Sequence, residues 1–481
     1  MEYICRVWGK QIKIIGWFLE MEKKKKSPRR LKFNTVQTVV IGFFGVILGG
    51  GILLSLPICN QKPIEFIDAL FTSVSSVCVT GLVTIVPAEQ FTLLGKIILL
   101  LLIQVGGLGV IACMSAFFLL LGKKINMKGR ITIQQAYGLD TLSGLVKFVI
   151  RILKGTFLVE GIGAVLFSLR FIPEFGFIKG VGYAIFHSVS AFCNAGIDIL
   201  GSTSFIQYSG SWLINFTTMF LIVMGGLGFP VWHDIAINIK KMTEIKKRPL
   251  KWLFTRLCLQ SKIVLTMTGL LILCGAVGFF LLEFNNPETM GDMNLLEKMT
   301  ASLFQSVTTR TAGFATVPQG DLRESSKLLG CMLMFIGGSP AGTAGGVKTT
   351  IAMLLLTVLC VLKNKRDTEC FARKIDNNIV RSGITITMIT LIFLMSGITA
   401  LTIFEPGIDF LDLTYEAASA MGTVGLTADL TPILSRGSHV ILMILMYVGR
   451  IGPLTMALAL SGRSDKISKI RELPEENVML G

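Results

Sequence analysis

Four glycines recur at similar places in four related stretches of the sequence. They are Gly81, Gly196, Gly313 and Gly425, and the stretches that contain them read FTSVSSVCVTGL, FHSVSAFCNAGI, FQSVTTRTAGF and YEAASAMGTVGL. Glycine accepts a backbone with positive φ and adds no side chain, so the carbonyl oxygens around it can face a common point. Rings of carbonyl oxygens replace the hydration shell of a monovalent cation. Cation coordination by backbone is therefore the chemistry that these residues predict.

The candidate filter is each of these glycines together with the two residues before it. Its members are Val79, Thr80, Gly81, Asn194, Ala195, Gly196, Thr311, Ala312, Gly313, Thr423, Val424 and Gly425. Because the ligands would be backbone carbonyls, the side chains can differ between copies, and they do. For a single copy, a glycine that only permits a tight turn or close helix packing explains the sequence equally well. Four copies in one register favour the ion-binding interpretation.

The copies belong to an internal repeat. Successive glycines are 115, 117 and 112 residues apart (196−81, 313−196 and 425−313), far beyond the roughly 20 to 50 residues of stacked solenoid repeats. A second landmark has its first glycine 24 to 29 residues after each filter glycine. Its copies read VGGLG from residue 105, MGGLG from 224, IGGSP from 336 and VGRIG from 448. Two landmarks in one register indicate a quadruplicated unit.

Each unit places a half-length apolar stretch between two long, largely apolar segments. A membrane-spanning helix needs about 20 apolar residues, and the stretches that end at the glycines are shorter. The predicted segments are 36–56, 64–76 and 97–121; 148–169, 182–193 and 212–232; 263–282, 295–309 and 328–362; and 383–404, 410–421 and 440–460. We therefore predict an all-α integral membrane protein with eight transmembrane helices. They would form four M1-P-M2 repeats, with four re-entrant pore hairpins around one pseudo-fourfold pore.

This pattern divides the chain into six parts. We expect a basic N-terminal segment over 1–34, repeats over 35–122, 147–238, 262–362 and 382–461, and a tail over 462–481. No cleavable signal is expected, because lysines interrupt the apolar residues near the N-terminus. An interfacial amphipathic helix and a disordered segment are both open interpretations of residues 1–34.

Composition and charge agree with a membrane protein. Of the 481 residues, 52% are hydrophobic, and the mean hydropathy is +0.68. The net charge of +16 would suggest a nucleic-acid partner in a soluble chain, but the basic residues gather between the units, as at Lys23–Lys26 and Lys246–Arg248. The hairpin sides carry acids such as Glu65 and Asp412. By the positive-inside rule, we expect a multi-pass cell-membrane protein in the lipid bilayer, with both termini cytoplasmic and no nucleic-acid partner.

Catalytic and metal-binding patterns are absent from the sequence. The ten cysteines form no C-x-x-C pair, and the three histidines form no H-E-x-x-H. We therefore expect no disulfide framework, no resident cofactor and no enzyme activity. A carrier for organic solutes is also poorly supported, because such folds generally use inverted repeats, whereas these four copies run in one direction.

The third unit departs from the repeat at its second landmark, where residues 337–350 read GGSPAGTAGGVKTT. A helix does not persist through five glycines and a proline. Irregular backbone at membrane depth is tolerated where it is packed in protein or lines a cavity. We interpret the segment as a gate below the filter, with a structural kink as the alternative. The candidate gate residues are Gly337, Gly338, Ser339, Gly342, Thr343, Gly345, Gly346, Lys348 and Arg450.

Arg450 is the only charged residue in 440–460 and takes the place of Gly107, Gly226 and Gly338 in the other copies. An intramembrane arginine usually faces the bundle interior and has partners there. Below a cation filter it would act as an electrostatic barrier and could donate to the carbonyls of 337–346. The alternative is a snorkelling arginine. Lys348 either shares this role or reaches the cytoplasmic interface.

Four further charged residues lie in or near the predicted spans. We expect Glu160 to pair with Lys154 or another basic side chain, and Arg310 to pair behind the filter with an acid such as Glu416. Asp198 and Asp429 follow two of the filter glycines. They would either concentrate cations at the mouth or be solvated loop residues, and the sequence leaves both open.

Three of these motifs resemble the Trk/Ktr/HKT superfamily of potassium transporters. They are SVTTRTAGF at 306–314, GGSPAGTAGGVKTT at 337–350 and YVGRIGP at 447–453, and the similarity covers residues 34–460. The resemblance implies potassium ion uptake through one pore of four repeats, with filter glycines at the four positions above. It also implies an intramembrane gating loop at 337–350, with Arg450 below the filter.

The same resemblance implies partners and an ion. Members usually form homodimers, and in Trk and Ktr systems they dock on a cytosolic ring of nucleotide-binding RCK-type subunits. This chain has no Rossmann fingerprint and lacks two extra leading spans, which fits a Ktr-type (KtrB-like) integral subunit. Four glycines are the potassium-selective pattern of the family, whereas a serine in the first copy is associated with sodium transport. A Na⁺-permeable or weakly selective transporter of the same fold is the alternative, and Na⁺ as a coupling ion in symport stays open.

Overall fold

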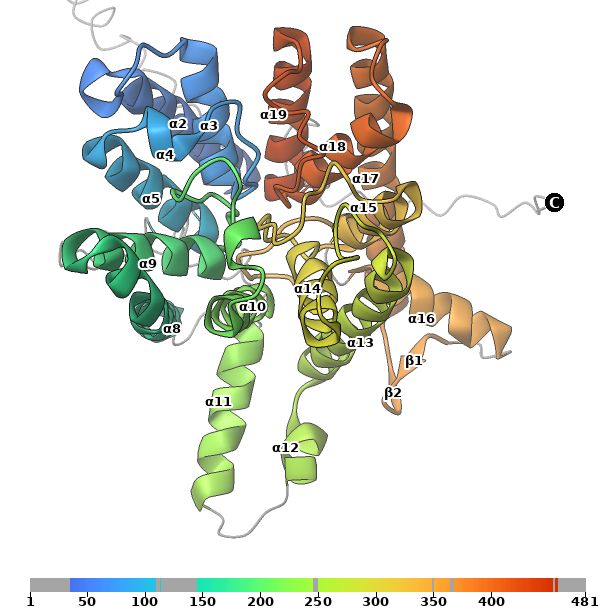
Figure 1. The fold of residues 1–481 in the computed structure, drawn as a ribbon. Helices are drawn as coiled ribbons and strands as arrows, with labels where there is room; N and C mark the ends of the chain where they lie inside the picture. The colour runs from blue at the N-terminus through green and yellow to red at the C-terminus, as the bar shows by residue number, and fades with distance from the viewer. Residues whose placement is uncertain are drawn as a thin grey trace, which may run out of the picture.

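The computed structural model describes residues 35–109, 113, 145–244, 250–347, 350–363, 367–452 and 455–456. The predicted N-terminal segment and C-terminal tail lie outside these residues. Helices dominate the described part, together with one hairpin of β1 (Glu369–Cys370) and β2 (Arg373–Lys374). Figure 1 shows the helices in four groups around a common centre, in chain order from blue through green and yellow to red.

Each group contains a long helix, then a short helix that ends just before one of the four glycines, then a third helix. The long helices are α2 (Thr35–Ser55), α8 (Leu145–Phe175), α13 (Leu259–Glu283) and α17 (Asn377–Phe404). The short helices are α3 (Phe66–Cys78), α9 (Phe177–Cys193), α14 (Leu295–Thr308) and α18 (Phe410–Gly422). The third helices are α5 (Leu93–Leu108), α10 (Trp212–Gly226), α15 (Glu324–Ile336) and α19 (Arg436–Ile451). The remaining elements are η1 (Pro57–Cys59), α4 (Pro87–Gln90), η2 (Ile206–Tyr208), α11 (Phe229–Glu244), α12 (Leu250–Arg256) and α16 (Thr350–Leu362).

Among the described residues, four helices are individually long and apolar enough to cross a membrane. They lie at Gln37–Ser55, Leu145–Phe175, Leu259–Glu283 and Asn377–Phe404, with mean hydropathies of 1.7 to 2.3. These are the long helices of the four groups, and much of their apolar surface is exposed, as at Phe44 and Ile392. Exposed apolar surface of this extent on long helices is what a bilayer covers.

The third helices all end at the second landmark. α5 stops at Gly109 (φ 85°), α19 stops at Gly452 (φ 92°), and Gly228 (φ 90°) separates α10 from α11 with a bend of 97°. In the third group the break comes earlier, at Gly337 (φ 63°), since Pro340 holds the fifth landmark position and cannot adopt a positive φ. The predicted continuous span over 212–232 is therefore wrong, because a left-handed glycine turns the chain there.

Close packing in each group depends on a glycine in the long helix. In three groups a serine of the short helix donates to a carbonyl of the long helix: Ser73 to Ile47 at 2.7 Å, Ser188 to Glu160 at 2.6 Å and Ser306 to Ile272 at 2.7 Å. A Cβ added three residues after each of these carbonyls, at Gly50, Gly163 or Gly275, would collide with that serine and with a leucine of the third helix. The fourth group places Gly397 against Leu445 in the same way. The short helices are thus held deep between the other two.

Candidate functional site

The four glycines come together in one closed ring. A Cβ built on Gly81 would lie 3.2 Å from the Cα atoms of both Gly196 and Gly425. A Cβ built on Gly313 would lie 3.1 Å from the Cα of Gly196 and 3.2 Å from that of Gly425. Each glycine therefore has its two neighbours in chain order beside it, and the fourth copy closes onto the first.

Carbonyl oxygens fill the space where side chains would otherwise be. A Cβ on Gly81 would lie 2.7 Å from the carbonyl oxygen of Ala195, and one on Gly196 would lie 2.6 Å from that of Ala312. The Gly313 and Gly425 positions meet the carbonyls of Val424 and Thr80 in the same way. The residue before each glycine thus presents its carbonyl to the preceding glycine of the ring, and no larger residue fits at any of the four places.

The backbone conformation repeats in all four copies. The residue two places before each glycine has a left-handed backbone, with φ of 57° at Val79, 60° at Asn194, 72° at Thr311 and 51° at Thr423. The glycines have φ of 107°, 62°, 80° and 96° in chain order. Left-handed backbone is uncommon for residues other than glycine and accumulates at functional sites. Because the short helices end here, their C-terminal ends, with partial negative charge, meet at the ring.

Hydroxyl groups of the short helices hold this backbone, and the sequence analysis did not identify them. The amides of Gly81 and Gly425 donate to Ser75 and Ser419 at 2.9 and 3.0 Å. In the other copies the hydroxyls donate instead, Ser190 to the Ile197 carbonyl and Thr308 to the Phe314 carbonyl, both at 2.6 Å. Aligning the four stretches would have revealed them, since each carries a hydroxyl five or six residues before its glycine.

The loop over 337–347 packs against the second group and against the ring. The amides of Ser339 and Thr343 donate to the carbonyls of Gly226 and Gly225 at 3.1 and 3.2 Å. The Thr343 hydroxyl donates to the carbonyl of Phe192 at 3.1 Å. A Cβ on Gly345 would lie 3.1 Å from the Cβ of Thr423, a residue of the candidate filter. The loop can therefore lie directly beside the filter residues because its side chains are small.

Arg450 joins the loop to the first group. Its guanidinium donates to the carbonyl of Thr343 in the loop and to the carbonyl of Gly106 in α5, with a longer contact of 3.3 Å to Gly107. The predicted contact between Arg450 and loop carbonyls is present. A cationic side chain from the fourth group thus ties the third group to the first. Lys348, the other predicted basic gate residue, lies outside the described residues.

Two predicted ion pairs are wrong. Arg310 does not meet Glu416: it donates to the carbonyls of Thr268 and Gly337, both at 3.3 Å, and so holds the first residue of the loop. Glu160 accepts from the side-chain amide of Gln104 at 3.0 Å instead of pairing with Lys154. Lys154 lies six residues earlier on the same helix, a spacing that puts it on another face.

The two acids after the filter glycines differ in their surroundings. Asp198 is half-buried and accepts the amide of Leu200 at 3.3 Å, and burial raises its pKa to about 6. Asp429 is exposed to solvent. Its pKa is raised, first by partial desolvation of the carboxylate and then by the negative charge of the nearby Asp321. Asp429 is thus the solvated one, whereas Asp198 orders a turn.

Comparison with known proteins gives a consistent result. A family model described as "TrkH: Cation transport protein" matches residues 9–470. The potassium/sodium uptake protein NtpJ of Enterococcus hirae is 38% identical, covering 95% of this chain and 99% of its own. The Ktr system potassium uptake protein B of Bacillus subtilis is 37% identical, covering 91% and 95%.

The fold is similar to a solved structure as well. The crystal structure of the potassium transporter TrkH from Vibrio parahaemolyticus superposes with a TM-score of 0.71, covering 91% of this chain and 87% of that chain. Its sequence identity of 18% limits this likeness to the fold. Since the family model spans nearly the whole sequence and two relatives exceed one third identity, the chain belongs to the TrkH family of cation transport proteins, membrane transporters rather than enzymes, and within the Trk/Ktr superfamily it is KtrB-like.

Proposed function

We propose that this chain is the ion-conducting subunit of a potassium-uptake system in the cell membrane. The observation that carries the proposal is the closed ring of Gly81, Gly196, Gly313 and Gly425, in which each glycine has beside it the carbonyl of the residue before the next glycine of the ring. Such carbonyls can replace the water around K⁺. The converging C-terminal ends of four short helices add negative potential at the same place. The names of the relatives, potassium uptake proteins, support the same ion.

Within this proposal, the four groups are M1-P-M2 repeats and supply eight transmembrane helices. The short helices are the pore helices of re-entrant hairpins, and the twelve residues of the candidate filter select the ion. The basic segments between the repeats support cytoplasmic termini. The repeats are those predicted over 35–122, 147–238, 262–362 and 382–461.

The loop over 337–350 is proposed as the gate, together with Arg450. Two features support this role: the loop lies beside Thr423, and Arg450 holds its Thr343 carbonyl against α5. A guanidinium next to the path of a cation raises the barrier to its passage. Opening would require Arg450 to release the loop, which would move both the irregular backbone and the positive charge.

Partners are proposed from the relatives. Proteins named as Ktr system potassium uptake proteins belong to a system of components, and three of the similar proteins carry that name. We propose that this chain forms a homodimer and binds a cytosolic nucleotide-binding subunit of the RCK type, since regulation by a nucleotide would need a partner.

The second candidate function is a Na⁺-permeable or weakly selective transporter of the same fold. The NtpJ relative, whose name couples potassium and sodium, favours keeping it. Glycine in the first copy, at Gly81, favours potassium.

Complementation of a bacterium that lacks potassium uptake tests both functions. The chain, expressed with and without a candidate RCK-type subunit, should restore growth at limiting K⁺ and accumulate ⁸⁶Rb⁺. Growth that is restored only with Na⁺ present would identify a coupling ion, and ²²Na⁺ entry at a similar rate would favour the weakly selective transporter. Failure to restore growth in every combination, with the protein present in the membrane, would contradict the proposal.

A further inference from the structure

One position of the short helices is polar in all four copies and lies outside the candidate filter. It is the second residue of the FTSV, FHSV, FQSV and YEAA sequences, namely Thr72, His187, Gln305 and Glu416. All four side chains are fully buried. Buried polar groups are costly without hydrogen-bond partners, so their partners show what the position does.

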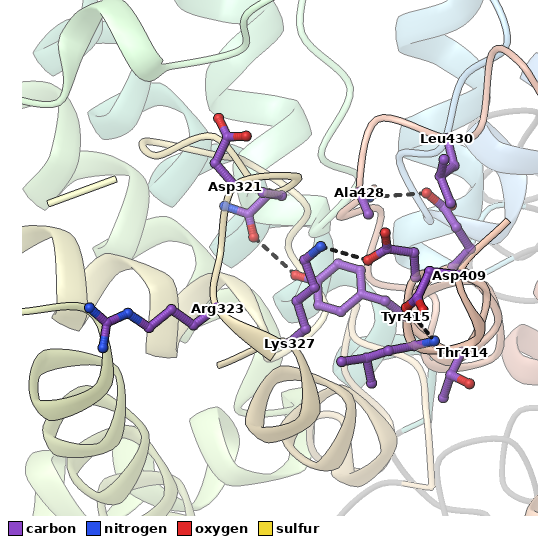
Figure 2. A network of polar contacts seen from close by, with 12 residues as sticks. Asp321, Arg323, Lys327, Asp409, Thr414, Tyr415, Ala428 and Leu430 are labelled. Carbon is purple, nitrogen blue, oxygen red and sulfur yellow. Dashed lines mark hydrogen bonds and ion pairs between the residues drawn. The ribbon is translucent and has the colours of Figure 1, made fainter. Parts of the chain in front are cut away.

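Glu416 holds the chain that follows Gly425. Its carboxylate accepts from the hydroxyls of Thr427 and Thr431, the latter at 2.8 Å, and from the amide of Ala428 at 3.1 Å. Figure 2 draws the hydrogen bond at the Ala428 backbone as a dashed line. These donors lie two to six residues beyond the glycine, so a single carboxylate fixes the whole segment that leaves the ring.

His187 does the same with a different side chain. Its Nδ1 lies 2.7 Å from the carbonyl of Tyr183 and so carries the proton, which leaves Nε2 free to accept. The amide of Ile199 donates to Nε2 at 3.4 Å. Ile199 follows its glycine by three residues (199−196), as Ala428 does (428−425). The same backbone amide is therefore held in two copies by a glutamate and a histidine.

Gln305 holds the third copy through a second glutamine. Gln305 and Gln319 exchange two side-chain hydrogen bonds of 2.6 and 3.1 Å, and Gln319 lies six residues beyond Gly313. The hydroxyl of Tyr415, from the fourth group, also donates to Gln319 at 2.9 Å (Figure 2). The segment after Gly313 is thus held by its own short helix and by the next one.

Thr72 differs, and it supplies a matched control. Its hydroxyl donates to the Asp68 carbonyl in its own helix at 2.8 Å and does not reach the segment after Gly81. That segment is held by Asp68 instead, which accepts from Thr84, three residues beyond the glycine, at 2.8 Å. Thr72 therefore shares the position and the burial of the other three residues without their contacts.

We propose that His187, Gln305 and Glu416 are positioning residues that fix the chain on the far side of the filter glycines and thereby set the preference for K⁺ over Na⁺. This inference rests on the proposed function. The short helix fixes each filter strand before the glycine, and these side chains fix it afterwards. With both ends held, the carbonyl ring cannot contract around a smaller cation. The side chains differ because each copy offers different donors: two hydroxyls and an amide to Glu416, one amide to His187, and an amide side chain to Gln305.

The test compares Glu416→Ala with Glu416→Gln and Thr72→Val. Initial uptake of ⁸⁶Rb⁺ and ²²Na⁺ is measured in the complemented cells with the full chain and its subunit, and is normalised to the amount of protein in the membrane. Glu416→Ala should lower the ratio of Rb⁺ to Na⁺ uptake about tenfold, the equivalent of about 1.4 kcal/mol. Glu416→Gln keeps an oxygen for the Ala428 amide and should recover much of the ratio. Thr72→Val should keep the wild-type ratio.

A wild-type ratio in Glu416→Ala protein would overturn the inference, and so would an equal loss in Thr72→Val protein. If Glu416→Ala protein does not reach the membrane, His187→Ala and Gln305→Ala carry the test, and unchanged ratios in both would overturn the inference. Wild-type protein that transports no Rb⁺ at all would instead contradict the proposed function, so the two failures are distinguishable.

Discussion

The glycine ring and the loop over 337–347 use the same residue type in opposite ways. In the ring, four copies repeat one backbone conformation while their side chains differ, as at Val79 and Asn194. The loop occurs once, and it is held by a particular side chain, Arg450, and by carbonyls of the first and second groups. A function made by backbone tolerates side-chain variation between copies, whereas a function made once depends on individual residues.

The two regions also differ in how they are joined to the rest of the molecule. A side chain added at any ring glycine would meet the backbone of a neighbouring copy, so a change at one copy acts directly on the next. The loop depends on contacts with helices from the other groups. We therefore expect changes in the ring to abolish transport and changes in the loop to alter its rate.

The largest effect should come from Gly313→Asp. A Cβ there would meet the Val424 carbonyl, and the carboxylate would add a negative charge to the carbonyl ring. We expect loss of ⁸⁶Rb⁺ uptake at limiting K⁺ in complemented cells. Gly407→Asp is the matched control, because a Cβ at Gly407 has no atom within 4 Å and the residue lies in an exposed turn. Unchanged K⁺ affinity in Gly313→Asp protein would contradict the filter assignment.

Arg450→Ala tests the other region and should act in the opposite direction. Removing the guanidinium frees the Thr343 carbonyl and takes away a positive charge, so uptake should rise by up to about tenfold if a charged hydrogen bond holds the loop closed. Deletion of Gly342–Gly346 should also raise uptake. Initial ⁸⁶Rb⁺ rates measure both, with Arg381→Ala, at an exposed position, as the control. Rates equal to wild type in both variants would exclude the loop from gating.

Two ion pairs between helices, both outside the ring and the loop, differ in how far their cations are exposed to solvent. Lys327 in α15 pairs with Asp412 in α18 at 2.6 Å (Figure 2), and its side chain is only 10% exposed. Arg436 in α19 pairs with Asp68 in α3 at 2.7 Å, but it is 48% exposed. Lys327→Met removes the buried cation, leaves the partly buried Asp412 (24% exposed) without its ion-pair partner, and should cost about 3 kcal/mol. Arg436→Gln should cost less than about 1 kcal/mol.

Thermal unfolding of the detergent-solubilised protein measures this difference through tryptophan fluorescence. Equal melting temperatures for the two variants would mean that burial does not separate the two ion pairs. Neither variant removes a contact of the loop, so neither should raise the uptake rate as Arg450→Ala does.

Much of the ring could be predicted from sequence, because a repeat compares the chain with itself. The four glycines, the second landmark and the oddity of Arg450 all appear once the copies are aligned. The contact between Arg450 and the loop followed from the cost of an unpaired charge at membrane depth. The structure added the contacts that close the ring, with Gly425 beside Gly81, and the hydroxyls that hold its backbone.

The partners of buried groups could not be predicted in the same way. The sequence predicts a partner of opposite charge for Arg310 and for Glu160. In the structure Arg310 meets two backbone carbonyls and Glu160 meets a glutamine. Neutral partners leave no charge pattern in the sequence. The turn at Gly228 was missed for a related reason, since GGLG in an apolar segment fits close helix packing as well as a break. At Gly228 the break is accompanied by a contact with the loop, since the carbonyl of Ala341 accepts the Phe229 amide at 3.0 Å.

The smallest expected effect concerns Glu405, at the end of α17 and away from both regions. Its carboxylate accepts from the amide of Ser435 and the hydroxyl of Ser438, both at 2.7 Å, at the start of α19. Burial pushes the pKa of Glu405 up, but these hydrogen bonds outweigh it and the pKa is lowered. A lowered pKa in the folded state means that the stabilisation is complete above the ordinary carboxyl pKa of about 4.3 and is lost as the pH falls through the folded value.

Glu405→Gln should therefore lower the free energy of unfolding at pH 7 by about 1 kcal/mol or less, which appears as a slightly lower melting temperature. The difference from wild type should shrink below about pH 4. A difference that stays constant from pH 7 to pH 3 would show that the charge of Glu405 does not stabilise the fold, and a changed Rb⁺ to Na⁺ ratio would show that the outer helix ends are coupled to the ring.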